Sequence, residues 1–205
     1  MLGSYQTAHL SNKEHDKFKN DQIEKTFGPN INNIIVGKRN FYRNKISLTR
    51  GGFMPPGPRR RYSIIPINSE QFDLMDIDWN KYKNDELPIR IIRRLETEIS
   101  DKPGTKISVY GKMLGKKFSV SLDSFYQVND EMAELAYKDI INHTPKNQVV
   151  LDLFGGGAII GILVSDIAKK VYSVDINNDN HLDAKKNIEL NNSKNVVPIL
   201  SDVNK

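Results

Sequence analysis

The spacing of apolar residues changes character near Asn129 of this 205-residue chain. Before that point, short apolar stretches alternate with polar residues and are interrupted by Gly and Pro, a pattern typical of short strands and turns. After it, continuous apolar runs alternate with segments of helical periodicity. The pattern predicts a strand-rich α+β region followed by an α/β region.

Two segments of the first region carry helix signals. Residues 11–27 predict a helix, because Ser11 suits an N-cap and Gly28 with the following Pro ends the pattern. In residues 88–100, "PIRIIRRLETEIS", a helix is favoured over a strand-rich segment, since Pro88 suits a first helical turn. Short strands are expected at residues 31–36, at 41–49 and, as two strands around a glycine-containing turn, at 106–122.

The segment that begins at Asn129 predicts a β-α-β-α-β series after an initial helix. Asn129 suits the N-cap of that helix, and Asp130 and Glu131 suit the positive end of its dipole. Its apolar face is expected to hold Met132, Leu135, Ala136 and Ile140. The series continues with a strand at 147–154, a glycine turn, a helix at 158–170, a strand at 171–176, a helix at 178–192 and a strand at 196–202. Such a series implies a parallel sheet with right-handed crossovers.

Composition narrows the class of protein. Hydrophobic residues make up 38% of the chain and charged residues 27%, which is typical of a soluble globular protein. We see no apolar run long enough for a membrane helix and no secretory signal, so we expect a cytoplasmic monomer that does not engage a membrane. The chain has no Cys, which excludes disulfides, thiolate metal sites and Cys nucleophiles within it. The four His residues do not cluster, so no metal site is expected.

Basic residues are concentrated in one segment. The net charge is +5, yet residues 146–205 hold 7 basic and 7 acidic side chains. Residues 35–62 hold eight basic residues and no acidic one, with aromatic residues between them. Basic side chains neutralise phosphates and aromatic rings stack on bases, so this segment favours nucleic-acid binding. A solvated charged surface beside a hairpin is the alternative.

The glycine turn predicts a nucleoside cofactor site. A strand that runs into Gly155-Gly156-Gly157 and then a helix places backbone N–H groups beside a ligand. The next strand ends in Asp175, 18 residues after Gly157, where an acid can accept hydrogen bonds from ribose hydroxyls. A glycine loop alone is weak evidence, and the acid at this distance strengthens it.

Two carboxylates favour S-adenosyl-L-methionine over NAD in this site. Asp152 precedes the glycines within the strand, where it can face the ammonium-bearing end of that cofactor; a structural strand-end carboxylate is the alternative. Asp202 follows the third strand, where it can meet the adenine amino group; a helix N-cap is the alternative. An NAD-linked oxidoreductase is disfavoured, because the cofactor unit begins in mid-chain and no hydride-site His or Tyr constellation is visible.

Three separated motifs resemble the RNA uracil-5 methyltransferases. The run "SFYQVN" (124–129) precedes a helix and "VLDLFGGGAIIG" (150–161), as in that family. Upstream, "FYRNKISL" (41–48) is similar to the family's Tyr-Arg-Asn-Lys segment. Residues 2–19 resemble the stretch where many members begin with Cys-Gly-Gly-Cys. The motifs occur in the family's order and span nearly the whole chain, which makes the resemblance specific.

The resemblance implies methylation of C5 of a uridine in rRNA or tRNA, with S-adenosyl-L-methionine as donor. The implied fold is an RNA-binding region at residues 1–122, then a Rossmann-like class I methyltransferase domain, incomplete, at 123–205. Gln127 would contact the carboxyl or sulfonium region of the cofactor, and Phe125 and Asn129 would anchor their loop; Gln127 satisfying a strand end is the alternative. The expected cofactor-binding residues are Gln127, Asp152, Phe154, Gly155, Gly157, Asp175 and Asp202. The expected RNA-binding residues are Arg43, Asn44, Lys45 and Phe125.

The sequence differs from the family pattern at several positions, and each difference leads to an expectation about the site. Leu2 and Tyr5 stand where many members have cluster-binding cysteines, so no iron–sulfur cluster is expected. Ala158 replaces a glycine and Ile159 a polar residue that often touches the cofactor, which would crowd the site. The family's Cys nucleophile and carboxylate base would lie downstream of Lys205, so we expect no catalytic residue in this chain and no activity from it alone. A non-catalytic RNA-binding remnant is the alternative.

Overall fold

The structure is a computed structural model that describes residues 10–28, 31, 33–38, 43, 45–48, 52–53, 65–66, 81, 89–94, 97–101, 108–121 and 124–204. Between residues 45 and 101 it describes the course of the strands but not their side chains. Leu2, Tyr5 and Asn44 lie outside the described residues, and Lys45 is described by its backbone alone.

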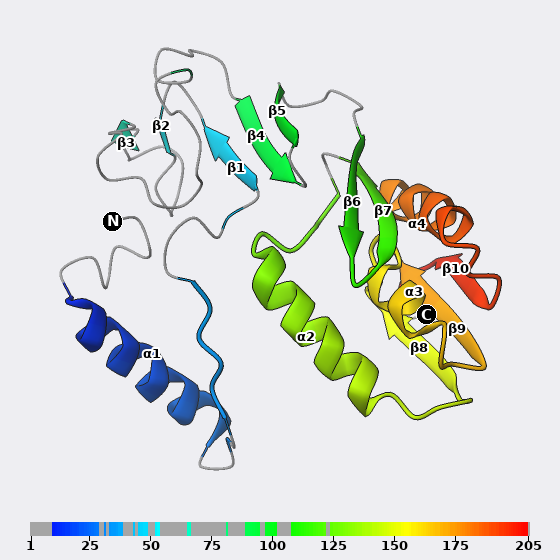
Figure 1. The fold of residues 1–205 in the computed structure, drawn as a ribbon, viewed down its shortest axis with the longest axis horizontal. Coiled ribbons are helices and arrows are strands. Elements are labelled where there is room, and N and C mark those ends of the chain that lie inside the picture. The colour runs from blue at the N-terminus through cyan, green and yellow to red at the C-terminus, as the bar shows by residue number, and fades with distance from the viewer. Residues whose placement is uncertain are drawn as a thin grey trace.

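The first helix, α1 (Asn12–Phe27), confirms the prediction for residues 11–27. The Ser11 side chain accepts from the Glu14 N–H at 3.4 Å, and the Ser11 N–H donates to Glu14 Oε2 at 2.8 Å, which completes a capping box. The helix ends at Gly28, whose φ of 76° favours glycine. No residue of α1 is buried, and Figure 1 shows the helix apart from the carboxyl-terminal sheet.

The strand-rich region contains a three-stranded antiparallel sheet of order β1-β4-β5 and a two-stranded sheet of β2 and β3. Their bounds are β1 (Lys45–Leu48), β2 (Gly52–Phe53), β3 (Ile65–Pro66), β4 (Ile89–Arg94) and β5 (Thr97–Asp101). The helix favoured over residues 88–100 is therefore wrong. In "IRIIRR" the strand is completed by pairing with β1 on one side and β5 on the other, and this non-local pairing overrides the local signal of Pro88.

The strand expected at 31–36 is also wrong for its described residues, 31 and 33–36, which form no ladder. The chain at Gly37 instead passes so close to helix α2 (Asp130–His143) that an added Cβ would meet Met132 Sδ at 2.6 Å. At Gly37 this segment packs against α2 and does not pair with a strand.

A hairpin of β6 (Ser108–Met113) and β7 (Lys116–Ser121) confirms the two strands expected within 106–122. Leu114 and Gly115 form its turn with φ of 48° and 81°, the positive values that a tight two-residue turn requires. The side chains that point inward are buried: Val109, Met113, Phe118 and Val120.

The predicted α/β series is confirmed. Strands β8 (Val149–Leu153), β9 (Lys170–Asp175) and β10 (Val196–Leu200) form a parallel sheet of order β10-β9-β8. The connecting helices are α3 (Ile159–Val164) and α4 (Asn178–Leu190). Among the described residues, every helix is too short or too polar to cross a lipid bilayer.

Helix α2 begins at the expected N-cap, since Asn129 Oδ1 accepts from the Met132 N–H at 3.1 Å. Its expected apolar face is wrong, because Leu135 and Ile140 are 39% and 37% exposed. The buried residues of α2 are Ala133 and Tyr137, one turn apart. The helix is rotated so that this narrower stripe packs on α3.

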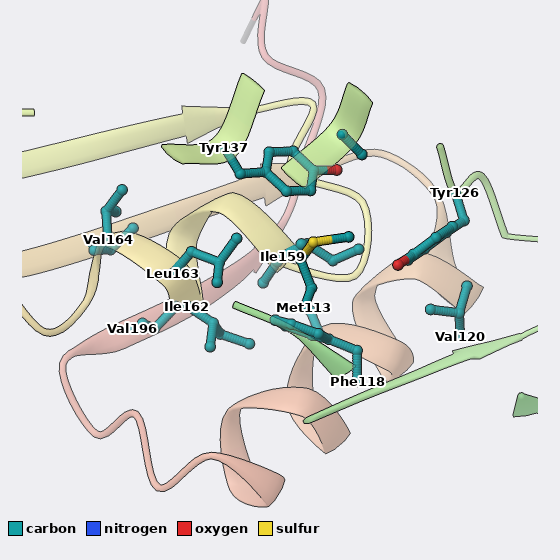
Figure 2. Close-up of a cluster of buried hydrophobic side chains, with 14 of the residues drawn as sticks. Met113, Phe118, Val120, Tyr126, Tyr137, Ile159, Ile162, Leu163, Val164 and Val196 are labelled. Atoms are coloured by element: carbon teal, nitrogen blue, oxygen red, sulfur yellow. The ribbon is translucent and has the colours of Figure 1, made fainter. Parts of the chain in front are cut away.

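The hydrophobic core joins the hairpin to the α/β region. Figure 2 shows Met113 and Phe118 of the hairpin among Ile159, Ile162 and Leu163 of α3, with Tyr137 of α2 beside them. Burial of this cluster stabilises the packing of the hairpin on the α/β region. On β8, in contrast, Val149, Leu151 and Leu153 are 57%, 64% and 50% exposed, so an apolar strip of the sheet is uncovered.

Polar side chains of α4 bind the backbone of β7 like a neighbouring strand. Asp183, Asn187 and Asn191 lie one turn apart on one face of the helix region. Their side-chain oxygens accept from the N–H groups of Ser121, Ser119 and Lys117 at 2.8, 2.6 and 2.9 Å. The hairpin and α4 are thus joined by hydrogen bonds as well as by the core.

Candidate functional site

The glycine loop, residues 154–158, connects β8 to α3 and is tied to the end of β9. The Gly155 N–H donates to the Val174 carbonyl at 3.0 Å, and the Gly156 N–H donates to Asp175 Oδ2 at 2.9 Å. The loop turns through positive φ values of 60° at Phe154, 55° at Gly156 and 59° at Ala158. These bonds bring the predicted glycine turn and Asp175 together at the carboxyl edge of the parallel sheet.

Close packing explains two of the glycines. A Cβ on Gly155 would collide with Ser173 Oγ and lie 2.8 Å from Asp152 Oδ2. A Cβ on Gly157 would lie 3.1 Å from Asn187 Nδ2. Gly155 therefore lets the loop approach β9 more closely than a residue with a Cβ allows, and a Cβ on Gly157 would require the Asn187 amide to shift by a few tenths of an ångström.

Asp152 is buried under the loop, where its hydrogen bonds are structural. Its Oδ2 accepts from Ser173 Oγ at 2.9 Å and from the Gly161 N–H at 3.1 Å. Burial raises the pKa of the Asp152 carboxyl; the two hydrogen bonds oppose the rise, and the charge of Asp175 adds to it. The carboxylate fixes α3 to β9, and contact with a cofactor remains a proposal.

Asp175 stands where the prediction placed it, at the end of β9. Its Oδ2 binds the glycine loop as above, and its Oδ1 accepts from the Asn177 N–H at 2.8 Å. A carboxylate offers about four acceptor positions, so capacity remains for a ligand hydroxyl. Asp202 follows β10 and closes a turn, accepting from the Asn204 N–H at 2.9 Å.

The "FYQVN" segment alternates between buried and exposed side chains. Tyr126 is buried in the core at 8% exposure, whereas Phe125 is 73% exposed and Gln127 is exposed. The expectation that Phe125 anchors this loop is therefore wrong, and Tyr126 is the anchor. Ser124, two residues before Tyr126, is also buried, and its Oγ donates to Asp183 at 2.8 Å.

Phe154 combines two unusual features. Its side chain is 75% exposed, and its backbone is left-handed with φ of 60°. A bulky residue in this conformation is strained, and such strain gathers where a chain is shaped for a ligand. The position is compatible with the expected contact between Phe154 and a cofactor.

The two substituted positions of the loop differ in their consequences. Ala158 is wholly buried with φ 59° and ψ 32°, a backbone conformation that favours glycine. Ile159 is 8% exposed and lies in the core beside Met113, as Figure 2 shows. Strain therefore falls on Ala158, while the Ile159 side chain is directed into the core.

Carboxylates gather around the site. Burial raises the pKa of the Tyr137 phenol, and the negative charges of Asp152 and Asp130 raise it further. The negative charge of Asp175 likewise raises the pKa of the Asp152 carboxyl. The negative charge gathered here favours a cationic ligand over an anionic one.

The basic segment reaches this site at the start of α2. Arg43 pairs with Asn129 in an isolated antiparallel bridge, and Lys38 Nζ lies 3.5 Å from Glu131 Oε2. Arg43 of the "YRNK" motif thus pairs with Asn129, the last residue of the "FYQVN" motif. No cluster of potential metal ligands occurs among the residues whose positions are described.

Comparison with known proteins gives two kinds of match. Residues 111–205 match the family described as TRM5/TYW2 methyltransferase domain. An uncharacterized RNA methyltransferase of Mycoplasma mobile is 36% identical over 210 residues, covering 99% of this chain and 56% of that protein. One from Streptococcus agalactiae is 37% identical over 86 residues, covering 41% of this chain and 19% of that protein. The chain thus spans about half the length, or less, of these curated relatives.

A solved structure with a TM-score of 0.70 shares the fold. The tRNA (uracil-54, C5)-methyltransferase of Pyrococcus abyssi, in complex with S-adenosyl-L-homocysteine, superposes with a TM-score of 0.70 at 14% identity, covering 93% of this chain and 62% of that one. The M. jannaschii tRNA m1G37 methyltransferase has a TM-score of 0.45 at 27% identity, covering 55% of this chain and 36% of that one. The expected Rossmann-like fold, with a strand-rich region before it, is confirmed.

Proposed function

The chain is homologous to RNA methyltransferases and carries a methyltransferase domain, and from this premise we propose that the protein methylates RNA at C5 of a uridine. S-adenosyl-L-methionine is the cofactor of this domain. The target base and the class of RNA are proposals, as is the activity of the whole protein.

The acidic field of the site suits this cofactor. S-adenosyl-L-methionine carries a sulfonium and an ammonium group. The negative charges of Asp152 and Asp130, which both act on Tyr137, would attract these cationic groups. In this proposal Asp175 accepts hydrogen bonds from the ribose hydroxyls, and the glycine loop lies against the methionine part of the cofactor. NAD would instead bring a pyrophosphate against these carboxylates, which disfavours the oxidoreductase alternative.

The pairing of Arg43 with Asn129 is the observation that carries the RNA proposal. It brings the acid-free basic segment to the motif that holds Gln127, so phosphates bound by the segment would lie near the cofactor edge. Phe125, at 73% exposure, offers an aromatic face on the same motif for stacking on an unpaired base. Base methylation requires such a base to leave its stack, at a cost of a few kcal/mol.

A guanosine in tRNA is the second candidate target, and the match of residues 111–205 to the TRM5/TYW2 family favours it. The two chemistries differ in what they require. Methylation at uracil C5 proceeds through a Cys nucleophile in the family resembled. A ring nitrogen of guanine is itself nucleophilic once a base removes its proton, so it needs no covalent step.

The experiment that decides is nucleoside mass spectrometry of RNA from cells with and without the gene. Loss of 5-methyluridine supports the first target, and its location in purified tRNA or rRNA identifies the substrate. Loss of 1-methylguanosine would support the second target instead. Unchanged methylation in all RNA fractions would refute the proposal and favour a non-catalytic RNA-binding protein.

The boundary expected between residues 122 and 123 remains a proposal. The bonds between β7 and α4, and the match that begins at residue 111, favour placing the hairpin with the cofactor domain. Limited proteolysis that releases a stable fragment beginning before Ser108 would support this revision.

A further inference from the structure

Asn187 is wholly buried between the hairpin and the glycine loop, and its amide bonds to both. Its Oδ1 accepts from the Ser119 N–H at 2.6 Å, and its Nδ2 donates to the Gly157 carbonyl at 2.9 Å. The Ser119 N–H is a donor and the Gly157 carbonyl an acceptor, so only one orientation of the amide satisfies both. The side chain is therefore fixed in place by two backbone segments distant in sequence.

The bond to Gly157 determines which way the loop faces. A peptide carbonyl buried here needs a donor, and Asn187 provides it from the α4 side. With that carbonyl held inward, the loop keeps the conformation in which Gly156 N–H reaches Asp175 Oδ2 at 2.9 Å. Gly157 itself leaves space for the amide, since a Cβ there would meet Nδ2 at 3.1 Å.

We propose that Asn187 is a positioning residue for the cofactor: it touches no ligand, but holds the glycine loop in its binding conformation and so sets cofactor affinity. The inference rests on the cofactor proposed for this site. It extends that proposal to the hairpin of β6 and β7. The Asn187 amide that bonds to Gly157 also bonds to Ser119 of β7, so the hairpin helps to hold the glycine loop.

Asn191 offers a matched control. Its Oδ1 accepts from the Lys117 N–H at 2.9 Å and its Nδ2 donates to the Lys117 carbonyl at 2.6 Å, so it also joins α4 to the hairpin. Its Nδ2 also donates to the Asn187 main-chain carbonyl at 2.8 Å, and within the described part of the chain it makes no hydrogen bond to the glycine loop. Asn187→Leu and Asn191→Leu remove bonds of the same chemistry, and only the first releases Gly157.

The test measures S-adenosyl-L-homocysteine binding by calorimetry and amide hydrogen exchange of residues 153–160 in both variants. For Asn187→Leu we expect affinity to fall about tenfold or more, as loss of one buried hydrogen bond allows, with faster exchange in the loop. Asn191→Leu should speed exchange in the hairpin while leaving affinity within about twofold. Equal changes in affinity or in loop exchange for the two variants would overturn the proposal.

Two outcomes keep the inference separate from the proposed function. If the parent chain binds no cofactor, the cofactor assignment fails, and loop exchange alone still decides whether Asn187 holds the loop. If Asn187→Leu does not fold, Asn187→Ala removes the same bonds without adding volume and takes its place.

Discussion

The carboxylate of Asp175 accepts a hydrogen bond from the Gly156 N–H at 2.9 Å, so the end of one strand holds the loop that follows its neighbour. Asp175→Ala removes this bond and the proposed ribose acceptor together. We expect S-adenosyl-L-homocysteine to bind at least about a hundredfold more weakly, since each bond to a charged group contributes about 1.5–3 kcal/mol. Asp179→Ala, which removes an exposed carboxylate in the first turn of α4, is the control. Unchanged affinity in folded Asp175→Ala would remove Asp175 from the site.

Ala158 should tolerate glycine but not a β-branched residue. At φ 59° glycine relieves strain of about 1–2 kcal/mol, which offsets the lost methyl group and the freer unfolded chain. Stability of Ala158→Gly should stay within about 1 kcal/mol, whereas Ala158→Val should lose about 2–3 kcal/mol by overpacking and strain. Urea unfolding measures both, with exposed Ala136→Val as control. A mild effect of Ala158→Val would show that the loop is not in this conformation.

Phe125 and Tyr126 should separate function from stability. Phe125→Ala leaves the core intact, so its melting temperature should match the parent while RNA binding weakens by about 1–3 kcal/mol, as expected for one lost stack. Tyr126→Ala opens the core and should lose about 3–5 kcal/mol of stability. Filter binding of RNA and thermal melting distinguish them. Full RNA affinity in Phe125→Ala would exclude that residue from the interface.

Asp152 should make stability depend on pH. Its folded-state pKa lies above the ordinary 3.8, so the folded protein holds this proton more tightly than the unfolded chain does. The contribution is fully present below the ordinary pKa and is lost as pH rises through the raised folded value. Asp152→Asn keeps an acceptor for Ser173 and Gly161 but cannot titrate. The free energy of unfolding of the variant minus that of the parent should therefore increase as pH rises across this window. Urea unfolding at several pH values checks this, with exposed Asp21→Asn as the charge control; parallel profiles would contradict it.

The uncovered strip on β8 should make the chain self-associate. Leu151 is 64% exposed and Leu153 is 50% exposed on the same strand. Replacing both by Thr keeps strand propensity while removing apolar surface. Light scattering at matched concentration should fall, and the melting temperature should change little. Equal light scattering from the variant and the parent chain would show that self-association does not depend on Leu151 and Leu153.

The parallel series could be predicted because its signals are local and agree with each other. Each strand is an apolar run, the Asn129 cap lies just before its helix, and Asp175 stands at the expected distance from the glycines. The errors arise where distant contacts decide. Residues 89–94 become a strand through pairing with β1 and β5, and α2 buries Ala133 and Tyr137 according to where α3 lies.

The site was predictable only in part for the same reason. Glycines and acids carry a recognisable spacing, so Asp152 and Asp175 could be singled out. Asp183 and Asn187 could not, since their partners are backbone groups of β7 at sequence separations of 62 and 68 residues. Their four-residue spacing with Asn191 is the one signal that could have indicated a polar stripe on α4.

That stripe has a built-in length limit. Four residues of helix advance about 6.0 Å, whereas two residues of antiparallel strand advance about 6.8 Å. A helix can therefore follow the spacing of N–H groups on a strand only approximately. The axial mismatch is about 0.8 Å for each pair of bonded residues and adds up along the helix. Across the rungs at Asn191, Asn187 and Asp183 the side chains absorb this drift with distances of 2.9, 2.6 and 2.8 Å. The side chains of α4 are therefore in register with the N–H groups of β7 over a short stretch only. Asn187, whose amide also holds the glycine loop, lies at the centre of that stretch.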